Sequence, residues 1–154
     1  MRKLKSRDEE IIIEEVDFKI IESLNDNWDD EWKCLIEDKG QEYINYALLV
    51  NGSIEGLMTI KNEMIGSLEI YKLEVSITKR KIGYGTHLIS YACWLASTTY
   101  KETAKGLVSL YAKESSEGFY EQLEAKKMDE WHSYFLFEKH IVFRLAQNFE
   151  EGLK

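Results

Sequence analysis

A strand, a glycine turn, a helix and a second strand follow one another in the second half of the chain, and they constrain its fold most. Leu68–Ile77 alternates side chains between two faces, as a strand does. Gly83 and Gly85 come next, and apolar side chains then recur at helical spacing up to about Ser97. Leu107–Ala112 reads as the second strand. This succession predicts a strand–helix–strand crossover between parallel neighbours.

The rest of the chain adds strands and two short helices. Asn51-Gly52 joins two apolar runs and favours a type I′ turn, which predicts a β-hairpin. No internal repeat or low-complexity segment suggests a boundary, so residues 1–154 are expected to form a single domain. The further predicted elements are a strand at Ile11–Ile21, a helix starting at Trp28, the hairpin within Tyr43–Ile60, a helix with Phe119, Tyr120 and Leu123, and two strands within Trp131–Ala146, separated near Glu138-Lys139.

The charge and hydropathy of the chain exclude several classes of partner. The formal net charge of -8 offers no basic face for counterion release, so no nucleic-acid partner is expected. No apolar run approaches the roughly 18 residues of a membrane span, so no membrane partner and a cytoplasmic location are expected. Residues 1–10 are rich in basic side chains, but Glu14 interrupts the apolar run behind them too early for a signal peptide. They are expected to form a flexible charged tail.

The two cysteines and three histidines show no metal-ligand spacing, so no metal is expected. Cys34 and Cys93 stand alone in the sequence, without a Cys-x-x-Cys pair. Buried free thiols are the expectation, and a disulfide between the two stays open.

The glycine turn is suited to bind an anion. Gly83 and Gly85 lack a Cβ, so a ligand can approach the amides of residues 82–86 at the start of a helix. The P-loop does not fit because no Lys-Ser or Lys-Thr follows these glycines, and the dinucleotide fingerprint does not fit because Leu88 stands where a third glycine is required. A tight turn that holds no ligand is the alternative.

Two motifs at the expected separation resemble those of the GCN5-related N-acetyltransferases, the GNAT family. The resemblance covers most of the chain and implies an α/β acyl-CoA N-acyltransferase fold, with a mixed, mostly antiparallel sheet, a parallel central pair and flanking helices. The chain departs from the family pattern at Ile77, Lys81, Lys113 and Glu124-Ala125. The RxxGxG signature appears as Arg80, Gly83 and Gly85, and the FYxxL element as Phe119, Tyr120 and Leu123.

The resemblance implies acetyl-CoA as the co-substrate. Its pyrophosphate would lie on the amides of the glycine turn, and its pantetheine arm would pair with the strand before it. Arg80 either caps the turn or reaches a phosphate. The predicted cofactor-binding residues are Leu73, Val75, Arg80, Lys81, Ile82, Gly83, Tyr84, Gly85 and Thr86.

Acetyl transfer to an amine needs a neutral nitrogen, an oxyanion donor and a proton for the leaving thiolate. Glu69 matches the base of the histone-acetylating branch of the family, and a sheltered strand face would raise its pKa. A solvated glutamate is the alternative, and Glu74 on the opposite face is the second choice. A backbone amide near Val75 would be the oxyanion donor. Tyr120 matches the family's acid, and a packing aromatic is its alternative reading.

The acceptor is indicated by charge alone. Asp26, Asp29, Asp30 and Glu31 lie on the segment that lines the acceptor cleft in related folds, although a solvated acidic helix start explains them equally well. The expectation is an N-acetyltransferase acting on a primary amine, either a small cationic amine or a protein lysine or N-terminus. A homodimer is possible. The alternative is a non-catalytic acyl-CoA-binding or protein-interaction module of the same fold.

Overall fold

The structure is a computed structural model that describes residues 2–6, 9–17, 19–22, 24, 27–28 and 42–152. The chain divides into two compact units. The prediction that residues 1–154 form one domain stays a prediction. Unit 1 comprises Met1–Glu63, Lys72–Leu88 and Gly152–Lys154, and unit 2 comprises Met64–Tyr71 and Ile89–Glu151.

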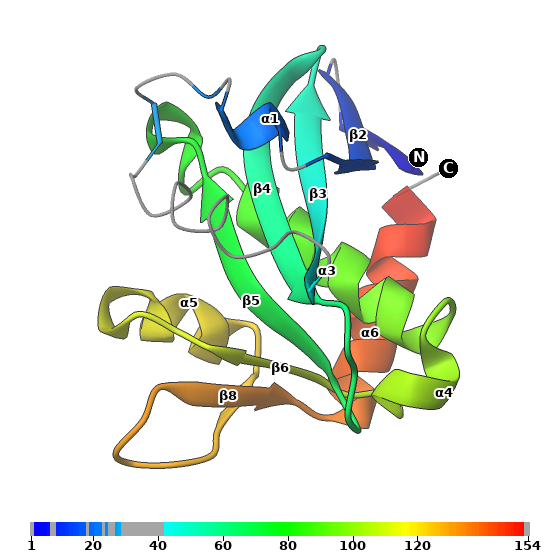
Figure 1. The fold of residues 1–154 in the computed structure, drawn as a ribbon, viewed down its shortest axis with the longest axis vertical. Coiled ribbons are helices and arrows are strands. Elements are labelled where there is room, and N and C mark those ends of the chain that lie inside the picture. Colours follow the sequence, from blue (N-terminus) through cyan, green and yellow to red (C-terminus); the bar gives the residue numbers. More distant parts are fainter. Residues whose placement is uncertain are drawn as a thin grey trace. The chain divides into compact units, whose positions relative to one another are not determined.

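In the part of the chain that the structure describes, eight strands form one sheet in the order β1-β2-β3-β4-β5-β6-β8-β7. Figure 1 labels β2, β3, β4, β5, β6 and β8. Strands β5 and β6 run parallel, whereas β1-β2, β2-β3, β3-β4, β6-β8 and β7-β8 are antiparallel pairs. The predicted fold class, a mixed and mostly antiparallel sheet with a parallel pair, is therefore confirmed. The strands are β1 (Arg2–Ser6), β2 (Glu9–Val16), β3 (Tyr43–Val50), β4 (Ser53–Lys61), β5 (Leu68–Val75), β6 (Val108–Tyr111), β7 (Lys126–Lys127) and β8 (Tyr134–Phe137).

The predicted hairpin is formed by β3 and β4 in unit 1. Asn51 and Gly52 both have positive φ angles, 50° and 86°, as a type I′ turn requires. Ala47 and Leu57 from the two strands are fully buried and pack against Trp28. One of the two buried faces of this hairpin is therefore covered by a residue from the segment between β2 and β3.

Helix α3 follows the glycine turn, as predicted. Its predicted apolar face is buried, because side chains spaced three or four residues apart lie on one side of a helix. Those buried side chains are Tyr84, Leu88, Tyr91, Ala92 and Leu95. The helices are α1 (Lys19–Glu22), α3 (Tyr84–Ser97), α4 (Lys101–Ala104), α5 (Glu117–Gln122) and α6 (Lys139–Gly152), and η3 (Ile77–Lys79) and η4 (Glu114–Ser116) are 3-10 turns.

The last predicted strand is wrong, because the chain after β8 forms helix α6. The buried side chains of this segment follow helical spacing, and Phe149, which continues it, lies beyond the predicted strand. In unit 2 the Phe149 ring lies 5.3 Å from that of Tyr91 and 6.0 Å from that of Trp94. The α6 side chains that are buried are Ile141, Val142, Leu145, Ala146 and Phe149.

The N-terminal predictions also need correction. Arg2–Ser6 forms β1, paired with β2, so the expected flexible tail is wrong there because backbone pairing does not depend on side-chain charge. Residues 9 and 10 already belong to β2. The strand predicted to reach Ile21 ends at Val16, and the Asp17 carboxylate accepts a hydrogen bond from the amide of Lys19, where α1 begins. Beyond Trp28, the predicted helix lies outside the described residues.

Candidate functional site

The glycine turn, residues 80–86, presents backbone amides at the start of α3. Lys81 and Gly83 have positive φ angles of 68° and 102°, which turn the chain from η3 into the helix. The amide of His87 donates to the carbonyl of Gly83 at 3.1 Å. The amides of Tyr84, Gly85 and Thr86 therefore precede the helical ladder and carry the positive end of the helix dipole.

The space around Gly83 indicates whether a ligand could approach the turn. A Cβ built at Gly83 would meet no atom within 4 Å, so the turn is open on that side. At a φ of 102°, any residue with a side chain would also be strained. The glycine is therefore required by the backbone, and the side it leaves open suits the close approach of an anion to the amides.

Three consecutive cations precede the open amides, at Lys79, Arg80 and Lys81. Arg80 turns back onto the end of β5: its Nε donates to the carbonyl of Val75 at 3.1 Å, and its guanidinium lies 3.3 Å from the Glu74 carboxylate. Arg80 therefore ties the turn to the end of β5, and its predicted role at the cofactor stays a prediction. Lys79 and Lys81 are exposed beside the amides.

Asn27 is hydrogen-bonded to η3, directly before the glycine turn. The sequence did not indicate this role. Its Nδ2 donates to Thr78 Oγ1 at 2.9 Å, and its Oδ1 accepts from the Thr78 amide at 3.1 Å. The Asn27 carbonyl also accepts from the amide of Ile77 at 2.9 Å. A residue 51 positions earlier thus holds η3 by three hydrogen bonds, and no local pattern in the sequence signals that pairing.

Two more carboxylates of unit 1 bind residues in the turn or close to it. The hydroxyl of Ser76, directly before η3, donates to the Glu55 carboxylate, and the Ser76 amide donates to the Glu55 carbonyl at 2.9 Å. Tyr84 donates its hydroxyl to Glu9 at 3.0 Å. Burial and the Glu9 carboxylate raise the pKa of Tyr84, so this contact persists across the physiological pH range.

Close packing fixes the start of α3. A Cβ on Gly56 in β4 would come within 2.9 Å of the Leu88 side chain and 3.2 Å of Leu48. The absent side chain at Gly56 lets Leu88 of α3 approach the hairpin. Sequence reasoning did not single out Gly56, because a glycine inside a strand does not reveal what approaches it.

The strand before the turn carries the predicted pantetheine contacts. The parallel register of β5 with β6 runs from Leu68 to Ile70, and β5 continues to Val75. Leu73 and Val75 are half-buried in this extension. All nine predicted cofactor-binding residues thus lie in one continuous stretch of unit 1, from Leu73 to Thr86.

The two predicted catalytic residues lie in unit 2. Glu69 is half-buried and stands opposite Ser109 in the β5–β6 register, and Tyr71 on the same strand face is exposed. Tyr120 in α5 is 6% exposed, with its ring 5.9 Å from that of Phe135. Burial raises the pKa of Tyr120 to about 12, so this phenol is protonated at neutral pH. Glu74, the second choice as base, is paired with Arg80.

Other predicted groups are placed only in part. Asp26, Asp29, Asp30, Glu31 and Cys34 lie outside the described residues. Cys93 is a buried free thiol, and burial raises its pKa. In the described part of the chain, no three histidine, cysteine or carboxylate side chains gather as a metal site would require. Among those same residues, no helix has both the length and the apolar character of a membrane span.

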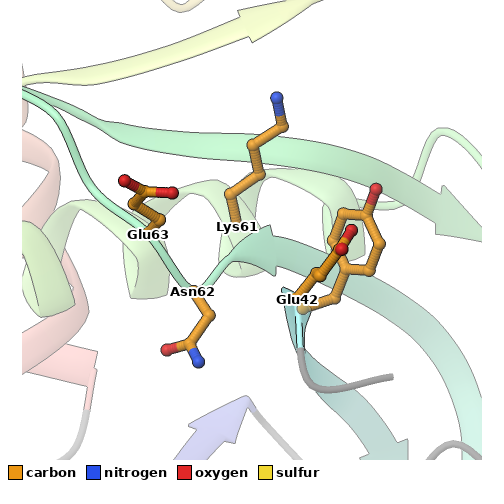
Figure 2. A pocket seen from close by; sticks show the side chains of 5 residues that line it. Glu42, Lys61, Asn62 and Glu63 are labelled. Carbon is orange, nitrogen blue, oxygen red and sulfur yellow. The ribbon is translucent and has the colours of Figure 1, made fainter. Parts of the chain in front are cut away.

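A polar pocket of about 670 Å³ lies elsewhere in unit 1, where β3 begins and β4 ends (Figure 2). Figure 2 shows Lys61 and Glu63 on one side of the chain, with Asn62 pointing away from them. The amide of Asn62 donates to the carbonyl of Glu42 at 2.9 Å. None of the predicted site residues lines this pocket, whose lining residues are Glu42, Tyr43, Lys61, Asn62 and Glu63.

Comparison with known proteins finds similarity to solved structures alone. No family model and no curated protein sequence matches the chain. A mutant of the toxin AtaT, bound to the C-terminus of the antitoxin AtaR and acetyl-CoA, has 15% identity and a TM-score of 0.69, covering 89% of this chain and 98% of its own. AtaT complexed with acetyl-methionyl-tRNAfMet has 16% identity and a TM-score of 0.66, with 88% and 98% covered. A KacTA–DNA complex has 15% identity and a TM-score of 0.62, with 90% and 99% covered.

These similarities concern the fold, which agrees with the fold implied by the GNAT resemblance. The prediction that excluded nucleic acid is wrong, because proteins of this fold are solved with tRNA and with DNA. The associated prediction of a small-molecule or protein amine as partner is corrected on the same finding. Net charge was a poor guide since it sums over the chain, whereas nucleic-acid contact depends on the local surface.

Proposed function

We propose that the chain is an acetyl-CoA-dependent N-acetyltransferase whose acceptor is the amino group of an aminoacyl-tRNA. The observation that carries the proposal is the glycine turn, where amides at a helix start, an open side at Gly83 and adjacent cations suit a pyrophosphate. AtaT, which shares the fold, is solved with acetyl-CoA and supports this choice of co-substrate. Acetyl-CoA supplies an acetyl group activated as a thioester.

The acceptor is proposed from a second similar structure. AtaT is solved with acetyl-methionyl-tRNAfMet, a tRNA whose amino acid carries an acetyl group. Amino acid α-amines have pKa values of about 7.7–8.0, compared with about 10.4 for lysine, so a useful fraction is neutral at pH 7. Such an amine needs only modest help from a base, which fits the half-buried Glu69. The reaction is proposed to take place in the cytoplasm, where aminoacyl-tRNA is found.

The proposed roles are those that the GNAT resemblance implies. The amides of residues 82–86, with Lys81, hold the pyrophosphate, and Leu73 and Val75 bind the pantetheine arm. In the transfer, the amine nitrogen bonds to the thioester carbon and the carbon–sulfur bond breaks. Glu69 accepts the proton that the amine loses, and Tyr120 donates a proton to the thiolate. The raised pKa of Tyr120 keeps that proton available.

The test is incubation of the protein with acetyl-CoA and methionyl-tRNA. Release of CoA and recovery of N-acetylmethionine after base hydrolysis of the tRNA are expected. Deacylated tRNA, which lacks the amine, is the matched control and should release no CoA. Binding of acetyl-CoA without release of CoA would support the non-catalytic module instead, and failure to bind acetyl-CoA would refute both readings.

A further inference from the structure

A group of exposed apolar side chains lies at one end of the β6–β8 pair in unit 2. Tyr111 is 64% exposed, Met128 46% and Trp131 88%. The register pairs Tyr111 with Tyr134, and the Met128 amide donates to the Tyr134 carbonyl at 2.9 Å. We name these four residues the aromatic end. A tryptophan as exposed as Trp131, in a loop that joins strands with further exposed apolar side chains, is typical of a binding surface.

The loop that carries Trp131 is held in a defined conformation. The Asp129 carboxylate accepts from the Trp131 amide at 2.7 Å and lies 3.0 Å from His132 Nδ1. The Ala112 amide donates to the Ser133 carbonyl at 2.7 Å, which ties the loop to the end of β6. The Tyr111 and Tyr134 rings lie 4.8 Å apart. The aromatic end is therefore a prearranged surface and needs little ordering on binding.

Charges near the aromatic end favour some partners over others. Lys126 and Lys127 are exposed and directly precede Met128. Lys127 pairs with Glu117 at 2.8 Å, and Glu117 also accepts from the Ser133 hydroxyl at 2.9 Å. Asp129 and Glu130 directly precede Trp131, so carboxylates offset the two lysines, and a nucleic-acid duplex, which is bound through many phosphate contacts, is disfavoured. Unpaired nucleotides can instead be bound by stacking of their bases on aromatic side chains, with few phosphate contacts.

We propose that Tyr111 and Trp131 stack on unpaired nucleotides at the CCA end of the acceptor tRNA, with Lys126 and Lys127 beside its backbone. The inference rests on the proposed function, because that function supplies an RNA whose amino acid is joined to a single-stranded end. In this proposal base stacking supplies most of the affinity, and the two lysines add a smaller contribution from charge.

The test compares Trp131→Ala and Tyr111→Ala with Phe143→Ala, which removes another exposed aromatic of unit 2, 60% exposed on α6. Binding is measured by fluorescence anisotropy of a labelled single-stranded oligoribonucleotide that ends in CCA. Loss of one stacking side chain should weaken binding by roughly 5- to 100-fold, and Phe143→Ala should leave it unchanged. Equal binding by Trp131→Ala and wild type, or an equal loss in Phe143→Ala, would overturn the proposal.

Salt dependence separates stacking from charge. Trp131→Ala should leave the slope of log affinity against log salt unchanged, whereas Lys127→Ala should reduce it by about 0.7. A reduced slope in Trp131→Ala would contradict stacking. Light scattering measures the oligomeric state of both proteins. If Trp131→Ala changed the oligomeric state without changing RNA affinity, the aromatic end would be a protein-binding surface, and the proposal would be overturned.

Turnover separates the two proposals from each other. Trp131→Ala should raise the KM for methionyl-tRNA while the KM for acetyl-CoA stays unchanged. A wild-type protein that acetylates methionyl-tRNA, with an unchanged KM in Trp131→Ala, would refute the stacking surface alone. A wild-type protein that releases no CoA with methionyl-tRNA would refute the proposed function, whatever the oligonucleotide binding shows.

Discussion

The glycine turn of unit 1 and the aromatic end of unit 2 are built in different ways. The turn offers backbone amides, and its shape comes from two positive φ angles and from hydrogen bonds with Asn27. The aromatic end offers exposed side chains, fixed by strand register and by Asp129. A site made of backbone is sensitive to a single added Cβ, whereas a surface made of side chains loses affinity in steps.

The comparison assigns different kinetic effects to the two units. Changes in the glycine turn should act on acetyl-CoA affinity, because the proposed pyrophosphate contacts lie there. Changes in unit 2 should act on turnover or on the acceptor, because Glu69, Tyr120 and the aromatic end lie there.

The largest effect is expected for Gly83→Val. The new side chain would occupy the open side of the turn and strain its backbone, so acetyl-CoA affinity should fall more than about 100-fold. Gly52→Val is the matched control, since Gly52 also has a positive φ and open space around its Cβ. The control should lose stability and keep its affinity in calorimetry. Retained affinity in Gly83→Val would remove the turn from the binding site.

Tyr120→Phe should lower kcat by about 100-fold and leave the KM for acetyl-CoA unchanged, because it removes only the proton donor. The variant's ring should pack as the tyrosine ring does, since the ring contacts with Phe119 and Phe135 do not involve the hydroxyl. With the pKa of Tyr120 at about 12, ionisation of this group should not limit wild-type turnover below about pH 11. An unchanged kcat would exclude Tyr120 as the acid.

Asn27→Ala should weaken acetyl-CoA binding by roughly 10-fold, because η3 loses two side-chain hydrogen bonds. The chain offers a matched pair in the same unit, in which Thr59 Oγ1 donates to Asn45 Oδ1 at 2.6 Å. Asn45→Ala should lower the free energy of unfolding without changing acetyl-CoA affinity. Equal losses of affinity in both variants would mean that Asn27 acts only through general stability.

The smallest effect concerns pH. Burial lowers the pKa of His87, in the first turn of α3, below its usual value near 6.5. Below that value the unfolded chain gains a proton that the folded chain does not, so His87 lowers stability as the pH falls from about 6.5. His87→Gln should therefore lose less stability than wild type between pH 7.5 and 5.5 in urea unfolding. Identical losses would show that His87 contributes nothing to the pH dependence.

The sequence predicted the glycine turn well because the turn is local. Gly83 and Gly85 adjoin the helix they serve, and the alternation of β5 and the helical spacing of α3 can be read without knowledge of distant partners. Contacts between distant residues were not predictable. Neither the Asn27–Thr78 pair nor the approach of Leu88 to Gly56 leaves a pattern in the sequence, because both depend on the completed fold.

The aromatic end and α6 were missed for related reasons. Whether Tyr111 and Trp131 are exposed depends on the strand register and on which elements pack over the sheet. As residue types, the two side chains are as well suited to a core as to a surface. The run that ends at Ala146 predicts a strand because Phe149, which completes the helical spacing of α6, lies beyond it. The prediction that excluded nucleic acid was wrong for a similar reason, since a net charge of -8 says nothing about where the cations lie.

Titration of the ¹⁵N-labelled protein with acetyl-CoA, followed by amide NMR, tests the central claim most directly. Acetyl-CoA should shift the amide signals of Ile82, Gly83, Tyr84, Gly85 and Thr86 and protect them from exchange, because these amides are proposed to donate to the pyrophosphate. The signal of Gly52, in the hairpin turn, should stay in place. Unchanged signals for residues 82–86 at saturating acetyl-CoA would contradict the account.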